Sequence, residues 1–111
     1  MATKLQRVSE LAGQTAKAVT QDVNGWKSYL NTASRIYKYP FDDQLLIYAQ
    51  RPDARACASM ELWNRTMHRW IKAGTKGIAL IHKNGGGTPH LDYVFDVSDT
   101  RAVRRSEGRE L

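Results

Sequence analysis

The chain has 111 residues, of which 41% are hydrophobic, so it can bury one modest core but not two. Its single cysteine, Cys57, cannot form an internal disulfide, and no paired Cys or Cys/His spacing indicates zinc. The 17 Lys and Arg outnumber the 11 Asp and Glu, and the formal net charge of +6 favours a polyanionic partner. The sequence shows neither a signal-peptide pattern nor the ~20 consecutive apolar residues of a membrane span, which predicts a cytoplasmic protein without membrane contact.

The first 50 residues predict three helices. Spacings of three and four between Leu5, Val8, Leu11, Ala12, Ala16 and Val19 indicate an amphipathic helix over residues 4–20. A second helix is expected from Asp22, a good N-cap, with an inner face of Val23, Trp26, Tyr29, Leu30, Ala33, Ile36 and Tyr37. Pro40 ends it, and a third helix follows with Asp42 and Asp43 near its N-terminus, ending before the turn at residues 51–53.

The remaining residues favour strands. A short helix is expected over residues 60–67, then a short strand within residues 70–77 that ends in a glycine turn, and an apolar strand at residues 78–82. After the turn at residues 84–87, Leu91, Tyr93, Phe95 and Val97 alternate with polar residues and Val94, which predicts an antiparallel hairpin.

This order of elements predicts an α+β fold in which three to four helices pack on a small antiparallel sheet that ends in a β-hairpin. We divide the chain into an N-terminal amphipathic helix at residues 1–21, an α+β domain at residues 22–100, and a charged tail or linker to further modules at residues 101–111.

The positive charge is concentrated in residues 51–83, which hold seven basic and two acidic side chains together with Trp63, His68 and Trp70. Cations interleaved with aromatic rings suit a nucleic-acid groove, where cations contact phosphates and rings stack on bases. The predicted nucleic-acid-binding residues are Lys38, Arg51, Arg55, Arg65, Arg69, Trp70, Lys72 and Lys76. Of these, Arg51 and Arg55 flank a turn and are expected to be exposed. Gly74 and Gly77 between these lysines either let a phosphate approach the backbone or form a solvated turn.

Each aromatic candidate has a packing alternative. Trp63 shares a helical side with Met60 and Met67, which favours burial, whereas Trp70 stands between Arg69 and Lys72 and is the better stacking candidate. Trp26 lies on an apolar stripe and is expected in the core. For Phe41 we favour a hydrophobic staple between two helices, and for Lys38 an exposed position.

The sequence offers several titratable candidates for catalysis, and none forms a complete set. These are His68, His82, His90, Cys57, Asp92, Asp96 and Asp99. Asp92 and Asp96 share a strand face, which we expect to be solvated, and Cys57 between two alanines suits a buried thiol. The glycines at residues 85–87 lack the Lys-Ser/Thr of a P-loop. We therefore expect no catalysis, no metal and no cofactor.

The segments YPFDDQLLIYAQRPDARACASMELWNRTMHRWIKAGTKGIALI and YVFDVSDT resemble the N-terminal domain of large, LtrC-like proteins carried by conjugative elements of Gram-positive bacteria. The pattern is also distantly similar to the N-terminal domain of ArdC antirestriction proteins. The shared features are a QLLI helix at residues 44–47, Trp63, a basic glycine turn at residues 72–78 and a VF.V strand at residues 94–97, within residues 22–100. The resemblance implies a single-stranded-DNA-binding domain that precedes enzymatic modules of the same protein.

Together these features predict a non-catalytic module that binds single-stranded DNA with little sequence preference. Two alternatives stay open at this point. The basic face could instead meet an acidic protein partner, as in antirestriction, or the domain could be a scaffold that packs on downstream domains and leaves apolar patches exposed without them.

Overall fold

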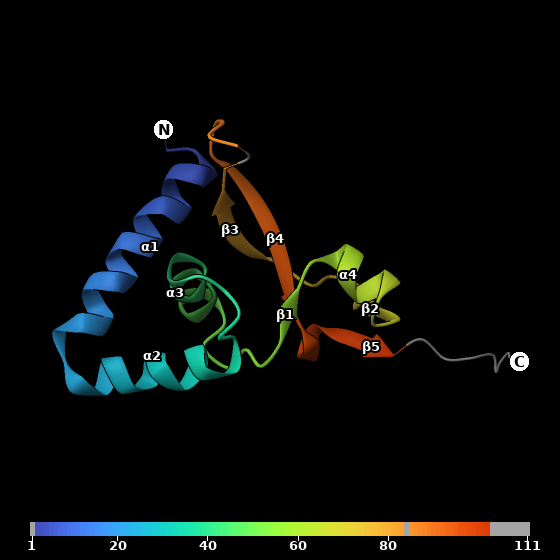
Figure 1. Cartoon of the computed structure of the whole chain (residues 1–111), viewed down its shortest axis with the longest axis horizontal. Helices are drawn as coiled ribbons and strands as arrows, with labels where there is room; N and C mark the ends of the chain where they lie inside the picture. The colour runs from blue at the N-terminus through green and yellow to red at the C-terminus, as the bar shows by residue number, and fades with distance from the viewer. Residues whose placement is uncertain (1, 84, 103–111) are drawn as a thin grey trace, which may run out of the picture.

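The structure is a computed structural model that describes residues 2–83 and 85–102 (Figure 1). It confirms the predicted α+β class. The helices are α1 (Lys4–Gln21), α2 (Val23–Arg35), α3 (Phe41–Gln50) and α4 (Met60–Arg65), with a 3-10 turn, η1, at Val97–Asp99. The strands are β1 (Cys57–Ala58), β2 (Arg69–Ile71), β3 (Ile78–His82), β4 (His90–Asp96) and β5 (Thr100–Ala102).

The first helix begins and packs as its sequence predicts. Thr3 and Gln6 form a reciprocal capping box in which each side chain accepts a hydrogen bond from the other residue's backbone N–H. Val8 and Val19 are buried, and Leu11, Ala12 and Ala16 pack beside them, so the predicted apolar face is confirmed. α1 contacts α2, α3 and β3.

The predicted inner face of α2 is only partly right. Asp22 caps the helix by accepting a hydrogen bond from the Gly25 N–H at 2.7 Å, as expected. Tyr29, Ala33 and Ile36 are buried, but the prediction is wrong for four others, because Val23, Trp26, Leu30 and Tyr37 are exposed. The reason is geometric: α1 and α3 cover one side of α2, and the predicted stripe was wider than that side.

The main sheet has the strand order β1-β4-β3, and both pairings are antiparallel. The predicted hairpin is confirmed, with Ile78 opposite Val94 and His82 opposite His90. The face assigned to β4 is wrong: Val94 and Asp96 are buried, whereas Tyr93 is exposed. The period of two was correct, but α1 and α3 pack on the side that carries Val94, Ile78 and Leu80, which lie in one core cluster.

A second, two-stranded sheet forms from β2 and β5. The strand expected within residues 70–77 is therefore short, and it pairs with β5 and not with β3. Arg101 and Ala102, which were expected in a charged tail, belong to β5, while the rest of that predicted tail at residues 103–111 lies outside the described residues. The paired residues of β2 and β5 are more than 25 positions apart in the chain, so no local sequence pattern indicated that these strands pair.

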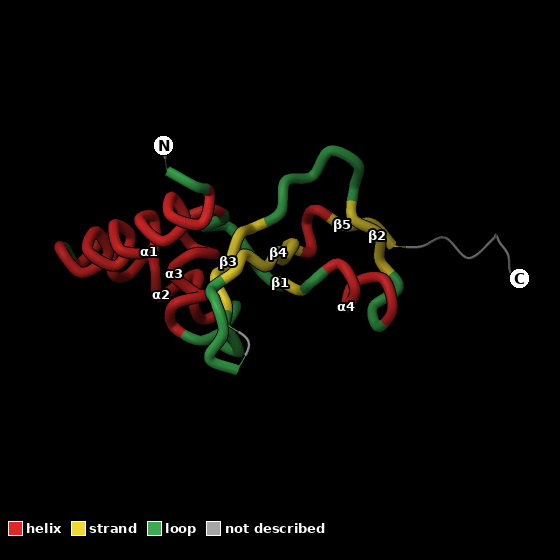
Figure 2. The backbone as a smooth tube through the Cα atoms, turned by 90° about the horizontal axis from the view of Figure 1, so that it is seen from above, coloured by secondary structure: helices red, strands yellow, loops and turns green. Residues whose placement is uncertain are grey.

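Seen from above, α1, α2 and α3 lie on one side of the main sheet, and α4, β2 and β5 lie on the other (Figure 2). β4 joins the two parts, since it pairs with β3 near the helices and with β1 beside α4. We call α1–α3 with β3 the helical lobe, and α4, β2, η1 and β5 the ribbon lobe.

Candidate nucleic-acid interface

One buried tryptophan anchors α4 to the main sheet. Ser59 caps the helix by accepting a hydrogen bond from the Leu62 N–H at 3.2 Å. The Trp63 indole is buried, as predicted, and its Nε1–H donates to the Phe95 carbonyl at 2.8 Å. Met60 and Met67, which were expected on the same side, are about half exposed. The Trp63 contact fixes the position from which the chain enters β2.

The turn between α4 and β2 leads into the two-stranded sheet. His68 adopts a left-handed conformation, with φ of 55°. In the sheet that follows, Trp70 is paired with Arg101, and Ile71 with Thr100. The Lys72 N–H donates to the Asp99 carbonyl at 2.9 Å, which extends the pairing by one step. We call β2, β5 and this extension the ribbon.

The two faces of the ribbon have different roles. Directly opposed residues of antiparallel strands share a face, so Trp70 and Arg101 lie side by side, and both are exposed. The other face carries Thr100, which is buried, and Arg69, whose Nε donates to Thr100 Oγ1 at 2.6 Å. Arg69 also donates to the Thr100 carbonyl at 3.2 Å and therefore holds β5 in place on the face opposite Trp70.

Arg51 was expected to be exposed, and this expectation is wrong. Its guanidinium is half-buried, forms an ion pair with Asp99, and donates to Ser98 Oγ at 2.8 Å. Burial opposes the charge, but hydrogen bonds to Asp53 and Asp99 outweigh it and raise the Arg51 pKa. Arg51 connects the end of α3 to η1, a contact that needs residues 47 positions apart in the chain.

Lys72 and Lys76 also lie near η1. Lys72 Nζ donates to the Ser98 carbonyl at 3.1 Å, and Lys76 lines a cavity of about 370 Å³ together with Arg51, Thr75 and Asp99. Gly77 packs closely on β4, because a Cβ there would lie 3.1 Å from Tyr93 and 3.2 Å from Phe95. Packing therefore accounts for Gly77, while Gly74 supplies a positive φ of 81° in the open part of the turn.

The other predicted residues lie away from the ribbon. Lys38 is exposed, as expected, and borders a cavity of about 210 Å³ with Tyr37, Tyr39 and Cys57. Arg55 is exposed on the segment before β1, and Arg65 on α4 lies 3.7 Å from Glu61. The predicted basic residues therefore do not form one continuous surface. Trp70 and Lys72 stay together, and Arg101, which the sequence assigned to a tail, joins them.

Three of the catalytic candidates meet at the end of the β3–β4 hairpin where the loop joins the two strands. His82 Nδ1 lies 2.7 Å from Asp92 Oδ2, and His82 Nε2 lies 3.1 Å from Oδ2 of Asp43, a buried residue of α3. His90 Nε2 lies 3.4 Å from the same Asp92 oxygen. Hydrogen bonds to Asp92 and then Asp43 raise the His82 pKa, and the bond from His82 lowers the Asp92 pKa. With a carboxylate at each ring nitrogen, His82 is a bridge between α3 and the hairpin.

We expect the His82 bridge to make stability depend on pH. A pKa raised on folding contributes stability that is fully present below the unfolded value of about 6.5, and this contribution is lost as pH rises through the folded pKa. The urea concentration at the unfolding midpoint should therefore decrease as the pH rises from about 6 through the neutral range. Chemical denaturation across this range measures the effect.

The matched variants are His82→Asn, which removes the bridging imidazole, and His68→Asn, which removes an exposed one while Asn still tolerates the left-handed backbone. His82→Asn should flatten the pH dependence, and His68→Asn should leave it in place. A wild-type midpoint that does not fall across this range contradicts the bridge.

Two of the other catalytic candidates are withdrawn from solvent, Cys57 in part and Asp96 almost completely. Burial raises the Cys57 thiol pKa to about 12, which keeps the thiol protonated at neutral pH. Asp96, expected on a solvated face, is only 1% exposed, and it accepts hydrogen bonds from the backbone N–H groups of Arg55 and Ala56 at 2.7 and 3.1 Å. The expectation for Asp96 is wrong because β4 turns into η1 there, and the carboxylate caps that turn.

The fold and this geometry define a small α+β domain with an exposed, basic, two-stranded ribbon. Comparisons of the chain with protein-family models, with curated proteins and with solved structures found no match. Within residues 2–83 and 85–102, none of the helices has the length and apolarity to cross a bilayer. In the same part of the chain, no cluster of His, Cys, Asp and Glu could hold a metal ion.

Proposed function

We propose that this domain binds single-stranded DNA, with little sequence preference, through the outer face of the ribbon. The observation that supports this proposal is the exposed Trp70 ring directly across the ribbon from Arg101. Lys72, two residues after Trp70, adds a second cation beside the ring. An exposed ring with adjacent cations is the combination that single-strand binding uses, because the ring stacks on a base while the cations contact its phosphates.

The single strand is favoured over the duplex because stacking on Trp70 needs a base whose face is free. In a duplex both faces of each base are stacked on neighbours, and removing a base from the stack costs a few kcal/mol. A ring contributes about 1–3 kcal/mol per stacked base and does not discriminate strongly among bases. Weak sequence preference follows from the same chemistry.

The resemblance to LtrC-like and ArdC N-terminal domains agrees with this proposal. In that setting the domain is a non-catalytic, cytoplasmic module of a protein from a conjugative element. Its role is to hold transferred DNA near enzymatic modules of the same protein. The competing proposal is a protein-interaction module, of the antirestriction or scaffold type, whose basic face binds an acidic partner.

The stacking role is tested by Trp70→Ala, with Trp26→Ala as the matched control. The two side chains are similarly exposed, at 44% and 40%, but Trp26 lies on α2 in the helical lobe. Loss of one stacked base should weaken binding of a labelled mixed-sequence oligonucleotide about 5- to 150-fold for Trp70→Ala. Trp26→Ala should leave the affinity unchanged in the same fluorescence anisotropy titration.

The electrostatic part is tested separately by the double variant Lys72→Glu with Arg101→Glu, measured at about 50 and 200 mM salt. Affinity should fall for all sequences, and the dependence on salt should become shallower. Reversing the charges of Lys17 and Lys27, which lie in the helical lobe, provides the control. Failure to bind single-stranded DNA even at low salt would sink the proposal and favour the protein-interaction alternative.

A further inference from the structure

A short turn after α2 presents an aromatic ring and a cation that are not part of the ribbon. The Tyr39 N–H donates to the Ile36 carbonyl at 3.1 Å, which closes a turn with Tyr37 and Lys38 at its two central positions. Both central side chains are exposed. At 69%, Tyr37 is the most exposed of the large hydrophobic side chains in residues 2–83 and 85–102, so its ring is free to contact a ligand.

The two ends of this turn are fixed. Ile36 is buried in the main core cluster, and the Tyr39 hydroxyl donates to the Cys57 carbonyl at 2.9 Å. Burial raises the Tyr39 pKa to about 12, which keeps the hydroxyl protonated as a donor at neutral pH. The turn is therefore held against β1, and little backbone freedom is lost when a ligand binds Tyr37 or Lys38.

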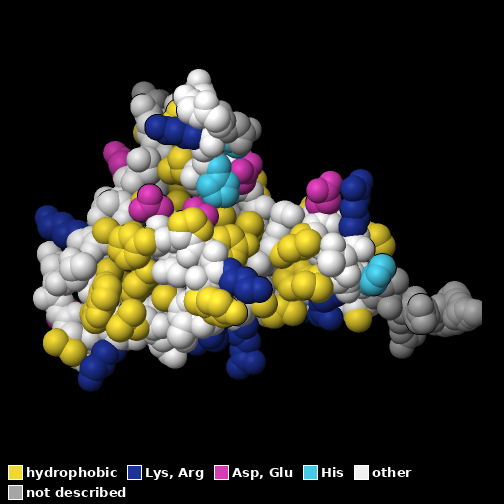
Figure 3. All heavy atoms as spheres, viewed as in Figure 1, with side chains coloured by type: hydrophobic (Ala, Val, Ile, Leu, Met, Phe, Trp, Pro, Cys, Tyr) yellow, Lys and Arg dark blue, Asp and Glu magenta, His cyan; other side chains and the backbone are white. Residues whose placement is uncertain are grey.

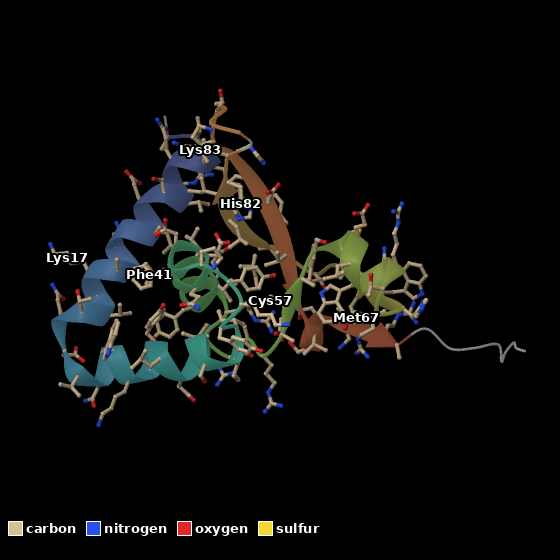
Figure 4. All side chains as sticks on the ribbon, viewed as in Figure 1. Lys17, Phe41, Cys57, Met67, His82 and Lys83 are labelled. Atoms are coloured by element: carbon tan, nitrogen blue, oxygen red, sulfur yellow. The ribbon has the colours of Figure 1, made fainter. Side chains whose placement is uncertain are left out.

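The segment before β1 lies beside the same hollow as this turn. The hollow has a volume of about 210 Å³, and its lining includes Arg35, Tyr37, Lys38 and Cys57. The Arg35 guanidinium donates to the carbonyls of Ala54 and Pro52 at 2.8 and 3.1 Å, which positions the backbone just ahead of the exposed Arg55. Cys57 lies between the helical lobe and the ribbon lobe (Figure 4). We call Arg35, Tyr37, Lys38 and Arg55 the junction site.

The three cations of the junction site have no carboxylate partner. Within residues 2–83 and 85–102, no carboxylate oxygen lies within 4 Å of a charged nitrogen of Arg35, Lys38 or Arg55. The hydrogen bonds of Arg35 go to backbone carbonyls, which leave its charge in place. Lys and Arg side chains lie along the lower part of the molecule from the helical lobe to the ribbon lobe (Figure 3), and the Asp and Glu side chains of that face gather above them.

The acidic groups near the junction site are buried, paired or directed to another hollow. They are Asp42, Asp43, Asp53, Glu61 and Asp96. Asp43 and Asp96 are buried. Asp53 lies 3.3 Å from Arg51, and Glu61 lies 3.7 Å from Arg65. Asp42 lines a separate hollow with Lys83. An anionic ligand at the junction site therefore meets three uncompensated cations.

A chain of hydrogen bonds connects the junction site to the ribbon. The Arg55 N–H donates to one oxygen of the Asp96 carboxylate at 2.7 Å, and the Ser98 hydroxyl donates to the other at 2.5 Å. The Ser98 carbonyl accepts in turn from Lys72 Nζ at 3.1 Å. Only a carboxylate and one residue of η1 therefore separate Arg55 from Lys72, so a ligand bound on the ribbon has a short distance to cross.

We infer that a single strand bound on the ribbon continues past η1 to the junction site, where a second base stacks on Tyr37 and phosphates contact Lys38 and Arg55. The inference rests on the proposed function, because it takes the same strand as its ligand. An acidic peptide would use the cations alone, whereas a strand of DNA uses the cations and the exposed ring together. The arrangement at Tyr37 thus repeats the one at Trp70.

Two stacking positions on one strand make the affinity depend on the length of that strand. Once an oligonucleotide reaches both positions, the second contact forms at a high effective concentration. The test compares mixed-sequence strands of about 4 and about 16 nucleotides, the limits of the site sizes of a common single-strand-binding fold. In fluorescence anisotropy titrations the longer strand should bind at least about tenfold more tightly.

Tyr37→Ala should weaken binding of the longer strand about 5- to 150-fold, because one stacked base is lost. Tyr37→Phe keeps the ring and should retain the affinity of the native protein. Trp26→Ala, which removes an exposed ring from α2, is the control and should have no effect. The exposure of Tyr37 means that neither Tyr37 variant should alter the urea midpoint.

The double variant Lys38→Glu with Arg55→Glu should weaken binding of the longer strand and make its salt dependence shallower. Reversing the charges of Lys17 and Lys27 provides the control, as it does for the ribbon. Chemical shifts in ¹H–¹⁵N spectra should change at residues 37, 38 and 55 as well as at the ribbon when the longer strand is added.

An affinity for the longer strand that is unchanged by Tyr37→Ala overturns the inference, and so does an equal loss in Tyr37→Phe, because stacking is then not the contact. Shift changes confined to the ribbon have the same meaning. Trp70→Ala is read in the same titration, so the two proposals fail separately: dependence on Trp70 alone overturns the junction site, and dependence on Tyr37 alone overturns the ribbon. A glutamate-rich peptide that shifts residues 37, 38 and 55 when the oligonucleotide does not also overturns the inference, because the partner is then an acidic protein.

Discussion

Replacing Trp63 with alanine should lower the free energy of unfolding by about 3–5 kcal/mol, the range for a buried tryptophan cut back to alanine. The indole is buried between α4 and β4, and its Nε1–H donates to the Phe95 carbonyl at 2.8 Å. The change leaves a cavity and also an acceptor without its donor. Urea denaturation followed by circular dichroism measures the loss.

Two further substitutions on the same contact separate packing from hydrogen bonding. Trp63→Phe keeps a ring but loses the N–H donor, so its effect should be intermediate, about 1–3 kcal/mol. Met60→Ala, on the exposed side of α4, should cost less than about 1 kcal/mol. If Trp63→Ala costs no more than Met60→Ala, then α4 is not anchored in the way the structure describes.

Replacing Asp96 with alanine should destabilise the protein by about 3–4 kcal/mol, because a buried carboxylate that satisfies several donors is removed. Its Oδ1 accepts from the backbone N–H groups of Arg55 and Ala56, and its Oδ2 accepts from the N–H of Ser98 at 3.1 Å and the hydroxyl of Ser98 at 2.5 Å. Without the carboxylate these donors lose their acceptor inside the protein. Thermal and urea unfolding of Asp96→Ala provide the measurement.

The Asp96 carboxylate should also make the stability of the protein depend on pH, in a direction set by its lowered pKa. Burial alone raises the Asp96 pKa, but the hydrogen bonds from Ser98, Arg55 and Ala56 outweigh it and lower the pKa below its ordinary value. A pKa lowered on folding contributes stability that is present above the unfolded value of about 3.9 and is lost as pH falls through the folded pKa. Asp96→Asn, which cannot ionise, should lose less stability than the native protein when the pH is lowered below 4 or so. An unchanged acid profile in Asp96→Asn contradicts this role.

Trp63 and Asp96 matter for function because they position the ribbon. Trp63 fixes α4 ahead of β2, and Asp96 caps η1 ahead of β5, so the two strands that place Trp70 opposite Arg101 both begin at a buried anchor. Neither side chain is exposed on the proposed DNA-binding surface. Their substitutions should therefore weaken DNA binding only as far as they unfold the ribbon lobe.

Features that depend on neighbours in the chain could be predicted from the sequence. The spacing of Val8, Ala12 and Val19 predicted α1. Asp22 marked the start of α2, and Pro40 marked where the next helix can start. The glycine turn predicted the β3–β4 hairpin. The exposure of Trp70 was also predicted from its neighbours Arg69 and Lys72, whereas Trp63 is buried although Met60 and Met67, from which its burial was predicted, are half exposed. Helical periodicity, caps and tight turns act over a few residues, so a single sequence carries them.

Features that depend on distant partners required the tertiary structure. The sequence predicted Arg101 in a charged tail, but it pairs with Trp70 and belongs to β5. It predicted a solvated Asp96, but the Asp96 carboxylate accepts hydrogen bonds from the backbone of Arg55 and Ala56. Arg51 looked like an exposed cation because its partner, Asp99, is 48 residues away in the chain. The sequence by itself determined the helices, the hairpin and the excess of positive charge. Which side of each element is covered, and which cations remain available to a ligand, was decided only by tertiary packing, because burial and ion pairing depend on contacts that local patterns do not encode.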